Sequence, residues 1–410
     1  MVTKNGKTVL LIGAMDVKSD EYGYVKTLLE DAGLKTVIMN FGTYKSQSNL
    51  QSDIHGRDIA LAGGVPIDEI REKKDPALAM RVMCDGVREL TPKVFSKGTF
   101  DGILGMGGSG GTSIISAAMQ TLPIGVPKVL VSTIASGNTS AYVGLKDITM
   151  IPSIVDVAGI NKISKIIYRQ AAGAMIGMLD IGLEETSDDK PIIAASMFGQ
   201  TTPCVTRCAE KLKNDGYEVL IFHGSGTGGK TMETMVNDGL IAGVLDITTT
   251  EWADELVGGV FAAGPDRLDG PGKFNLPHLI VPGCIEMVNF GAPETVPKKF
   301  KDRTFYQSKP TVTLMRTSIN ENKKMGEIFA EKINKAPQNK AVLIPTKGWS
   351  VVGAADGPFH NPEADKAFLD ILKANLDSSV PVYEEDMHIN DDSFSDKALQ
   401  LFAELMKKAS

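Results

Sequence analysis

The densest concentration of residues able to bind an anion is a glycine-rich run. Five of the seven residues from Gly105 to Gly111 are glycine, and the run lies between an apolar strand-like stretch and an apolar helical segment. Glycine lets backbone N–H groups approach a ligand because it has no Cβ. The free N–H groups of a following helix favour an anion such as phosphate. We therefore expect a phosphate-binding loop here, Gly105–Thr112, called the first glycine loop; the alternative is a tight turn with close packing.

Two further segments of the first half carry polar groups of the right kind. In the segment after Gly13, Lys18 could neutralise a phosphate and Asp16 could hold a ribose hydroxyl or hydrated magnesium. Alternatively, Asp16 and Ser19 cap the next helix. The hydroxyl-rich segment 132–140 could surround the same ligand or form side-chain turns.

Strand-like apolar runs alternate with helical stretches along the whole chain, which predicts an α/β fold with mainly parallel sheets. The expected strands cover residues 8–14, 36–40, 102–106, 128–133 and 148–152, then 192–196, 218–222, 243–247, 279–281, 312–315 and 341–344. The expected first-half helices cover residues 21–31, 76–97, 112–120 and 158–179. Ligands collect beyond the carboxyl ends of parallel strands. This rule places three first-half loops side by side: 13–18, 42–45 and 105–112.

The second half contains a literal match to the Walker phosphate-binding pattern. Residues Gly224–Thr231, called the second glycine loop, read GSGTGGKT after a strand-like run. A true Walker loop would place Lys230 on the phosphates and Thr231 on magnesium. The short helix that follows and the early strand ending near Asp246 weaken this interpretation, so the match is expected to be accidental. Whether the loop binds some other anion stays open.

Polar residues also follow several predicted strands of the second half. His223, Glu251 and Glu286 each come at or just after a strand end. A histidine beside carboxylates can perform general acid–base catalysis. These three residues are the candidate catalytic group of an alternative function, an ATP-independent hydrolase or lyase. Taken singly, His223 is as well explained as a hydrogen-bonded structural residue.

Composition limits the classes of function. With 410 residues the chain is long enough for two or three domains, and its net charge of −7 argues against nucleic-acid binding. No apolar run is long enough to span a membrane, and no secretion signal precedes the first strand. The four cysteines form neither a disulfide pattern nor a zinc pattern, so no metal site is assigned. A reducing cytoplasmic location is expected.

The acidic, polar stretch 184–190 predicts a linker between two domains, residues 1–183 and 191–410. A weak internal repeat supports this division. LEDAGLKTVIMN at 29–40 matches LKNDGYEVLIFH at 212–223 in pattern: the end of a helix, a glycine, then a strand. Both halves thus begin with the same strand–helix–glycine–strand order, which favours duplication, although convergent α/β patterns could produce the same match.

At these residues the chain resembles the tomato mosaic virus resistance protein family, which has an ATP-binding domain and many bacterial relatives. The resemblance covers nearly the whole chain. The segments that carry it are the loop 13–21, GMGGSGGTS at 105–113, IGVPKVLVSTIASGNTSAYVG at 124–144, PSIVDVAGIN at 152–161, ADELVGGVFAAGPDRL at 253–268, VPGCIEMVNFGAPETVP at 281–297 and VTLMRTS at 312–318.

The resemblance implies two Rossmann-like domains, each with a mainly parallel sheet flanked by helices, with ATP bound in the first and a homodimer as the assembly. Magnesium is a candidate cofactor, and an unidentified metabolite a candidate substrate. A third hypothesis is a binding module regulated by nucleotide. The expected nucleotide contacts are Gly13, Asp16, Lys18, Gly42, Gly107, Gly108, Ser109, Gly110, Gly111, Thr112, Thr133, Ser136 and Gly137.

Overall fold

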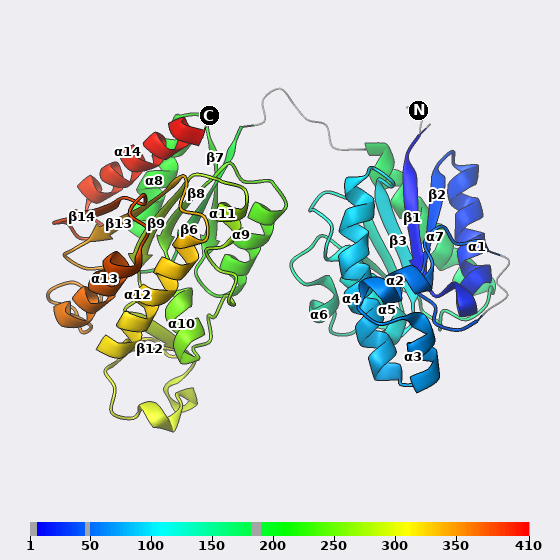
Figure 1. Cartoon of the computed structure of the whole chain (residues 1–410), viewed down its shortest axis with the longest axis horizontal. Helices are drawn as coiled ribbons and strands as arrows, with labels where there is room; N and C mark the ends of the chain where they lie inside the picture. The colour runs from blue at the N-terminus through cyan, green and yellow to red at the C-terminus, as the bar shows by residue number, and fades with distance from the viewer. Residues whose placement is uncertain (1–5, 46–49, 182–189, 410) are drawn as a thin grey trace. The chain divides into compact units, whose positions relative to one another are not determined.

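The computed structural model describes residues 6–45, 50–181 and 190–409. These residues form two compact units, one within residues 1–185 and the other within 186–410 (Figure 1). Of the expected linker 184–190, residues 184–189 lie outside the described residues. Across the described ranges, no helix combines the length and apolar character that crossing a bilayer requires.

The first unit is built on a five-stranded parallel sheet in the order β2-β1-β3-β4-β5. The chain runs from β1 to β2 on one side and then crosses to β3 on the other. Strands β1 and β3 therefore form a topological switch point, where α/β sheets leave a crevice at their carboxyl edge. The strands are β1 (Thr8–Gly13), β2 (Lys35–Asn40), β3 (Gly102–Gly107), β4 (Lys128–Ser132) and β5 (Thr149–Pro152).

Helices cover both faces of this sheet because alternate strand residues point to opposite sides. Leu10 and Ile12 pack in one apolar core with α2, α4 and α5, whereas Val9 and Leu11 pack in another with α1 and α7. The helices of this unit are α1 (Met15–Asp31), α2 (Gly56–Ala62), α3 (Ile67–Lys73), α4 (Pro76–Ser96), α5 (Ser109–Met119), α6 (Ser140–Val143) and α7 (Lys162–Ile181).

The second unit repeats this topology and extends it. Its six-stranded parallel sheet has the order β14-β13-β9-β8-β6-β7, so β6 and β8 form the corresponding switch point. A three-stranded antiparallel sheet, β10-β12-β11, is inserted between β9 and β13. The strands are β6 (Ile192–Met197), β7 (Glu218–His223), β8 (Gly243–Thr248), β9 (His278–Gly283), β10 (Met287–Phe290), β11 (Phe305–Lys309), β12 (Val312–Arg316), β13 (Lys340–Pro345) and β14 (Val382–Glu385).

Helices again lie on both faces. One core joins α8 to α14, and the other joins α10, α12 and α13. These two sheets and their helices confirm the expected α/β class with two Rossmann-like units. The helices are α8 (Thr202–Asn214), α9 (Thr227–Asn237), α10 (Glu251–Val257), α11 (Gly270–Lys273), α12 (Ile319–Asn334), α13 (Pro362–Asn375) and α14 (Asp392–Ala409), with short 3-10 turns at Pro293–Thr295 and Lys298–Phe300.

Helix α7 begins at Lys162 rather than at residue 158, and two other helix starts and one sheet assignment also differ from the sequence prediction. Helix α1 begins at Met15 rather than near residue 21, and α5 begins at Ser109 rather than at Thr112. Glycines 110 and 111 therefore lie in the first helical turn, where the N–H groups have no intrahelical acceptor in any case. The expected strand 312–315 is present, but it belongs to the antiparallel insertion. Apolar content predicts a strand and does not say which sheet the strand joins.

A buried tyrosine hydroxyl forms hydrogen bonds to both strands at the switch point of the first unit. Pairing between β1 and β3 ends at Ile12 and Gly105, beyond which the strands diverge. The Tyr22 hydroxyl, fully buried, accepts the N–H of Met106 at 2.6 Å and donates to the carbonyl of Ile12 at 2.5 Å. A Cβ on Gly13 would lie 2.2 Å from the Tyr22 ring, so residue 13 must be glycine for this packing.

The second unit solves the same problem with a serine. Pairing between β6 and β8 ends at Ala195 and Leu245, and the Ser196 hydroxyl then accepts the N–H of Thr248 at 2.8 Å. The two switch points thus share a device: a side-chain hydroxyl takes the backbone amide that strand divergence leaves without an acceptor. Such amides are costly to bury unpaired.

Replacing Tyr22 by phenylalanine should destabilise the first unit by about 1–3 kcal/mol, because the buried N–H of Met106 loses its acceptor. Equilibrium unfolding in urea measures this loss. Tyr24→Phe is the matched control, since Tyr24 on the same helix is only partly buried and packs against the same core. Equal stability of the two variants would contradict the role of the Tyr22 hydroxyl at the switch point.

Candidate functional site

The carboxyl edge of the first unit holds two cavities. The larger, called cavity A, has a volume of about 750 Å³ and lies where the loops after β1, β2 and β3 meet. Its walls are mostly apolar, and volumes of this size suit small-molecule ligands. It is lined by Ala14, Asp16, Val17, Phe41, Gly42, Thr43, Tyr44, Lys45, Ile70, Arg71, Lys74, Asp75, Pro76, Ala79, Met80, Met83, Gly110, Gly111 and Ile114.

Asp16 stands at the β1 side of cavity A. Its Oδ2 accepts the backbone N–H of Tyr44 at 2.9 Å, while its Oδ1 is buried and has no hydrogen-bond partner among the described residues. A Cβ on Gly42 would lie 2.3 Å from this carboxylate. Glycine at position 42 therefore lets the β2 loop close over Asp16, and the free Oδ1 oxygen can accept a hydrogen bond from a ligand.

Three cationic side chains line the same cavity: Lys45, Arg71 and Lys74. The Nε of Arg71 donates to the carbonyl of Thr43 at 2.5 Å, which fixes its guanidinium beside the β2 loop. Lys45 ends the predicted loop 42–45, whereas Arg71 and Lys74 were not predicted from the sequence. The cluster of basic residues within 71–74, just before the α4 cap Asp75, is a sequence signal for a cationic segment. The sequence alone does not place this segment beside the first glycine loop.

The smaller cavity, called cavity B, has a volume of about 520 Å³ and lies at the ends of β3, β4 and β5. Its lining is mostly polar and hydroxyl-rich, unlike that of cavity A. It is lined by Gly108, Ser109, Thr133, Ser136, Pro152, Ser153, Ile154, Val155 and Asp156.

The predicted nucleotide contacts therefore divide between two places. Asp16, Gly42, Gly110 and Gly111 line cavity A, whereas Gly108, Ser109, Thr133 and Ser136 line cavity B. The remaining five line neither cavity and have local roles: Gly13, Lys18, Gly107, Thr112 and Gly137.

Local contacts explain the positions of three of these residues. Thr112 is fully buried, with its hydroxyl 2.6 Å from that of Ser132. Lys18 donates through Nζ to the carbonyl of Val157, beyond β5. The N–H of Gly137 closes a turn on the carbonyl of Ile134. The roles of these residues toward a nucleotide stay predictions.

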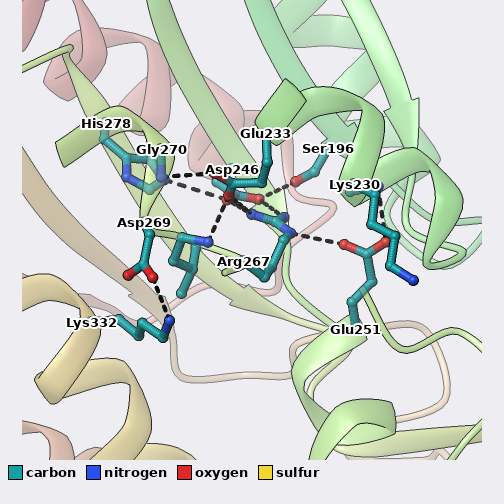
Figure 2. Close-up of polar contacts among 12 residues, drawn as sticks. Ser196, Lys230, Glu233, Asp246, Glu251, Arg267, Asp269, Gly270, His278 and Lys332 are labelled. Carbon is teal, nitrogen blue, oxygen red and sulfur yellow. Dashed lines mark hydrogen bonds and ion pairs between the residues drawn. The ribbon is translucent and has the colours of Figure 1, made fainter. Parts of the chain in front are cut away.

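The second unit is organised around a buried arginine (Figure 2). The Arg267 side chain is 1% exposed and forms two hydrogen bonds with the Asp246 carboxylate, at 2.6 and 2.7 Å. Its Nε donates to Glu251 at 2.8 Å. Burial alone would raise the pKa of Asp246, but the Arg267 charge and hydrogen bonds hold it well below its usual value. Asp246 also accepts the Ser196 hydroxyl, so this ion pair continues into the switch point.

Glu251 fills the anion position of the second glycine loop with a carboxylate of the chain itself. Its Oε1 accepts the N–H groups of Gly226 at 2.8 Å and Gly229 at 3.0 Å. A Cβ on Gly229 would lie 2.1 Å from this carboxylate. Gly229 is thus explained by packing on Glu251, whereas a Cβ on Gly228 would lie 1.9 Å from the carbonyl oxygen of His223. Within the described parts of the chain, the exposed Lys230 ammonium has no hydrogen-bond acceptor.

The three candidate catalytic residues lie in separate environments. Glu251 is bound to Arg267 and the loop, while the exposed His223 ring packs edge-on against Phe198 with centroids 5.2 Å apart. Glu286 is 1% exposed and accepts the Ser350 hydroxyl through Oε1; its Oε2 has no partner within the described ranges of the chain. Burial raises the pKa of Glu286 to about 7. Among the described residues, no hydrogen bond or ion pair joins any two of the three.

No group of three or more His, Cys, Asp or Glu side chains in the described ranges is arranged to hold a metal ion. A divalent cation bound here would depend on a phosphate ligand to complete its coordination, which is how magnesium is commonly held.

Substituting Arg267 by lysine should destabilise the second unit by about 3–5 kcal/mol, because one ammonium group cannot replace the guanidinium hydrogen bonds to Asp246 and Glu251 at the same time, and a buried carboxylate is left without its partner. Urea unfolding of the full chain measures the effect. The matched control is Arg207→Lys, whose ion pairs with Asp392 and Asp396 are partly exposed and should contribute under about 1 kcal/mol. Similar losses for both variants would contradict the central role of Arg267.

Glu286 should make the second unit less stable at alkaline pH. Because burial raises its folded-state pKa to about 7 from 4.5, the folded state retains the proton longer than the unfolded state. The stabilisation is complete below about pH 4.5 and is lost as pH rises through about 7, on the order of 1–3 kcal/mol. Glu286→Gln should flatten the dependence of unfolding free energy between about pH 5 and 8. The matched control is Glu294→Gln at an exposed position, which should leave the pH dependence of the unfolding free energy unchanged. The same pH dependence in both variants would show that Glu286 does not retain a proton in the folded state.

Comparison with known proteins shows the family to which the chain is related. Models of the Uncharacterised protein family (UPF0261) match along both halves: its N-terminal domain at residues 7–184 and its C-terminal domain at residues 190–406. A UPF0261 protein of Clostridium tetani is 43% identical over 98% of this chain and 100% of its own length. A UPF0261 protein of Rhizobium meliloti is 38% identical over 97% of this chain and 99% of its own.

The ToMV susceptible protein tm-1 of Solanum lycopersicum is 36% identical over 99% of this chain, which spans 56% of the tomato protein. Among solved structures, a UDP-N-acetylglucosamine 2-epimerase from Rickettsia bellii matches at 10% identity over 98% of this chain and 95% of its own, with a TM-score of 0.21, too low to support an inference. The tomato relative confirms the resemblance expected from the motifs. The chain therefore belongs to the UPF0261 family, together with these bacterial proteins and the matching part of the tomato protein.

Proposed function

We propose that the first unit binds an adenine nucleotide, with ATP as the physiological ligand, in cavity A. The observation that carries this proposal is the convergence of three loops, distant in sequence, on one cavity at the β1/β3 switch point. The loops after three different strands contribute Asp16, Gly42 and Gly110 to this cavity. All three residues were predicted from the sequence as nucleotide contacts. Switch points are where α/β sheets bind nucleotides.

The lining of cavity A offers complementary groups for each part of a nucleotide. Met80, Met83 and Phe41 supply an apolar wall for the base. Lys45 and Lys74 supply positive charge for the phosphates. The N–H groups of Gly110 and Gly111, in the first turn of α5, favour binding of an anion in cavity A beside the start of this helix.

Asp16 has a separate part in this proposal. Its unpartnered Oδ1 would accept a ribose hydroxyl, or would hold a water of a hydrated magnesium ion bound to the phosphates. Lys18 donates to the carbonyl of Val157, and its part is to position the β5–α7 segment rather than to contact phosphate.

The alternative of an ATP-independent hydrolase or lyase receives no support from the contacts of its three residues. Glu251 already has an arginine and two amides as partners, and among the described residues neither His223 nor Glu286 forms a hydrogen bond or ion pair with it. A nucleotide-regulated binding module has the same first-unit site as an ATP-using enzyme, and measured turnover separates the two. A cytoplasmic homodimer that binds no nucleic acid completes the proposal.

Titration of the full chain with ATP should show saturable binding at millimolar concentration or below. Ala79→Phe should weaken it about tenfold or more, because Ala79 lines cavity A from α4 and a phenyl ring would occupy the apolar end. Isothermal calorimetry measures both affinities.

Two control variants make this test specific. Ala77→Phe places the same ring on an exposed position of the same helix, outside cavity A, and should leave the affinity unchanged. Lys230→Ala should also leave it unchanged, because the second glycine loop already binds Glu251. Loss of ATP binding in Lys230→Ala with retention in Ala79→Phe would move the nucleotide site to the second unit.

A further inference from the structure

We propose that cavity B binds a second substrate, a neutral polyhydroxylated small molecule, and that the first unit transfers the γ-phosphoryl group of ATP to one of its hydroxyls. This inference rests on the proposed nucleotide site in cavity A. It adds a substrate class and a catalytic residue, Asp156, which the sequence analysis did not single out.

The two cavities meet at one turn of the chain. Gly108 and Ser109 line cavity B, and the next two residues, Gly110 and Gly111, line cavity A. These four residues form the cap and first turn of α5. A phosphoryl group held by the N–H groups of this turn would therefore face both cavities, so a nucleotide in A and an acceptor in B can meet without a large movement of the chain.

The chemistry of the cavity B lining selects the ligand. Ser109, Thr133 and Ser136 present hydroxyls, and Asp156 is the single charged side chain in the set of residues that line this cavity. No cation belongs to that set, so a phosphate or carboxylate ligand would lack a counter-charge. Hydroxyls that both donate and accept match a polyol or sugar.

Asp156 is held close to the point where the phosphoryl group would lie. An ideal Cβ on Gly108 would be 3.9 Å from Oδ1 of Asp156 and 4.0 Å from the Thr133 hydroxyl, so all three lie around the start of α5. Within the described ranges, no hydrogen bond or ion pair occupies the exposed Asp156 carboxylate. It is therefore available to accept a proton from a bound hydroxyl.

The segment that carries Asp156 is fixed on both sides. Before it, the N–H of Ser153 donates to the carbonyl of Ser132 at 3.1 Å. After it, Lys18 binds the carbonyl of Val157, and the buried Glu21 accepts the N–H of Gly159 at 2.5 Å. Ile154 has φ +65° with its side chain 72% exposed, a strained conformation for a β-branched residue. Helix α1 thus anchors the backbone that follows Asp156.

The reaction follows from this geometry. The acceptor hydroxyl oxygen forms a bond to the γ-phosphorus, and the bond from that phosphorus to the β–γ bridging oxygen breaks. The bonding electron pair stays on the bridging oxygen of ADP, and the acceptor proton passes to the Asp156 carboxylate. The products are ADP and a phosphate monoester of the polyol. Amides of the α5 turn stabilise the negative charge on the transferred group.

The experiment measures ADP formation by the full chain with ATP and magnesium, in the presence of glycerol, D-ribose or D-glucose as acceptor probes. We expect at least one of these to raise ADP formation about tenfold or more above the rate in water, and phosphorus NMR to show a new monoester. D-Glycerate, which carries a carboxylate, should be a poorer acceptor than glycerol because cavity B has no cation in its lining.

Two variants test the residue assignments. Asp156→Asn should lower turnover about 100-fold or more, the usual size of a general-base contribution, with ATP affinity unchanged. Ser136→Phe should raise the KM for the acceptor by filling cavity B, again with ATP affinity unchanged. Asp31→Asn, the same change at an exposed end of α1, should alter neither quantity.

Each outcome decides one part of the proposal. If ATP binds but none of the three polyols accelerates ADP formation, the acceptor site is wrong and the nucleotide site stands. If ATP does not bind, the proposed function fails and this inference fails with it. If a polyol is phosphorylated equally well by Asp156→Asn, the assignment of the base is overturned.

Discussion

Parallel strands that diverge at a switch point leave backbone amides without acceptors, and this constraint organises both halves of the molecule. In the first unit Tyr22 from α1 reaches across and pairs with Met106. In the second unit Ser196 takes the corresponding amide and donates to Asp246, which binds Arg267. In both units a side-chain hydroxyl therefore accepts a buried backbone N–H near the switch point. In the first unit this hydroxyl belongs to a tyrosine, and in the second it belongs to a serine that also donates to the buried ion pair.

The two solutions lead to different uses of glycine. Arg267 holds Glu251 where the second glycine loop presents its amides, so that loop is satisfied from within. Among the residues that the structure describes, no carboxylate accepts the N–H groups of Gly110 and Gly111 in the first glycine loop, and residues of this loop line cavities A and B. Although the second loop matches a phosphate-binding pattern more closely in sequence, it is residues of the first loop that line cavities A and B.

Sequence reasoning recovered the regular framework well, for identifiable reasons. Strands of parallel sheets are largely continuous apolar runs, so ten predicted strands correspond to strands of the two parallel sheets, and the eleventh corresponds to β12 of the antiparallel sheet. The matched repeat is also visible, since Gly33 and Gly216 both adopt positive φ between a helix end and a strand. It missed β10, β11 and β14, which are partly exposed or belong to a small antiparallel sheet and carry weaker apolar signals. It also missed Arg71, Lys74 and Asp156, which sit among ordinary surface residues in the chain.

The amino-acid sequence by itself determined the α/β class, the duplicated helix–glycine–strand pattern, and the glycine-rich segments able to bind an anion, because these follow from local periodicity and from the absence of a Cβ. Only the tertiary structure decided which amides remain free. That depends on whether a carboxylate from a distant segment reaches them, as Glu251 does for Gly226 and Gly229 across more than twenty residues of chain. Spacing in the sequence does not encode such a contact, since strand order and helix packing set the distance in space.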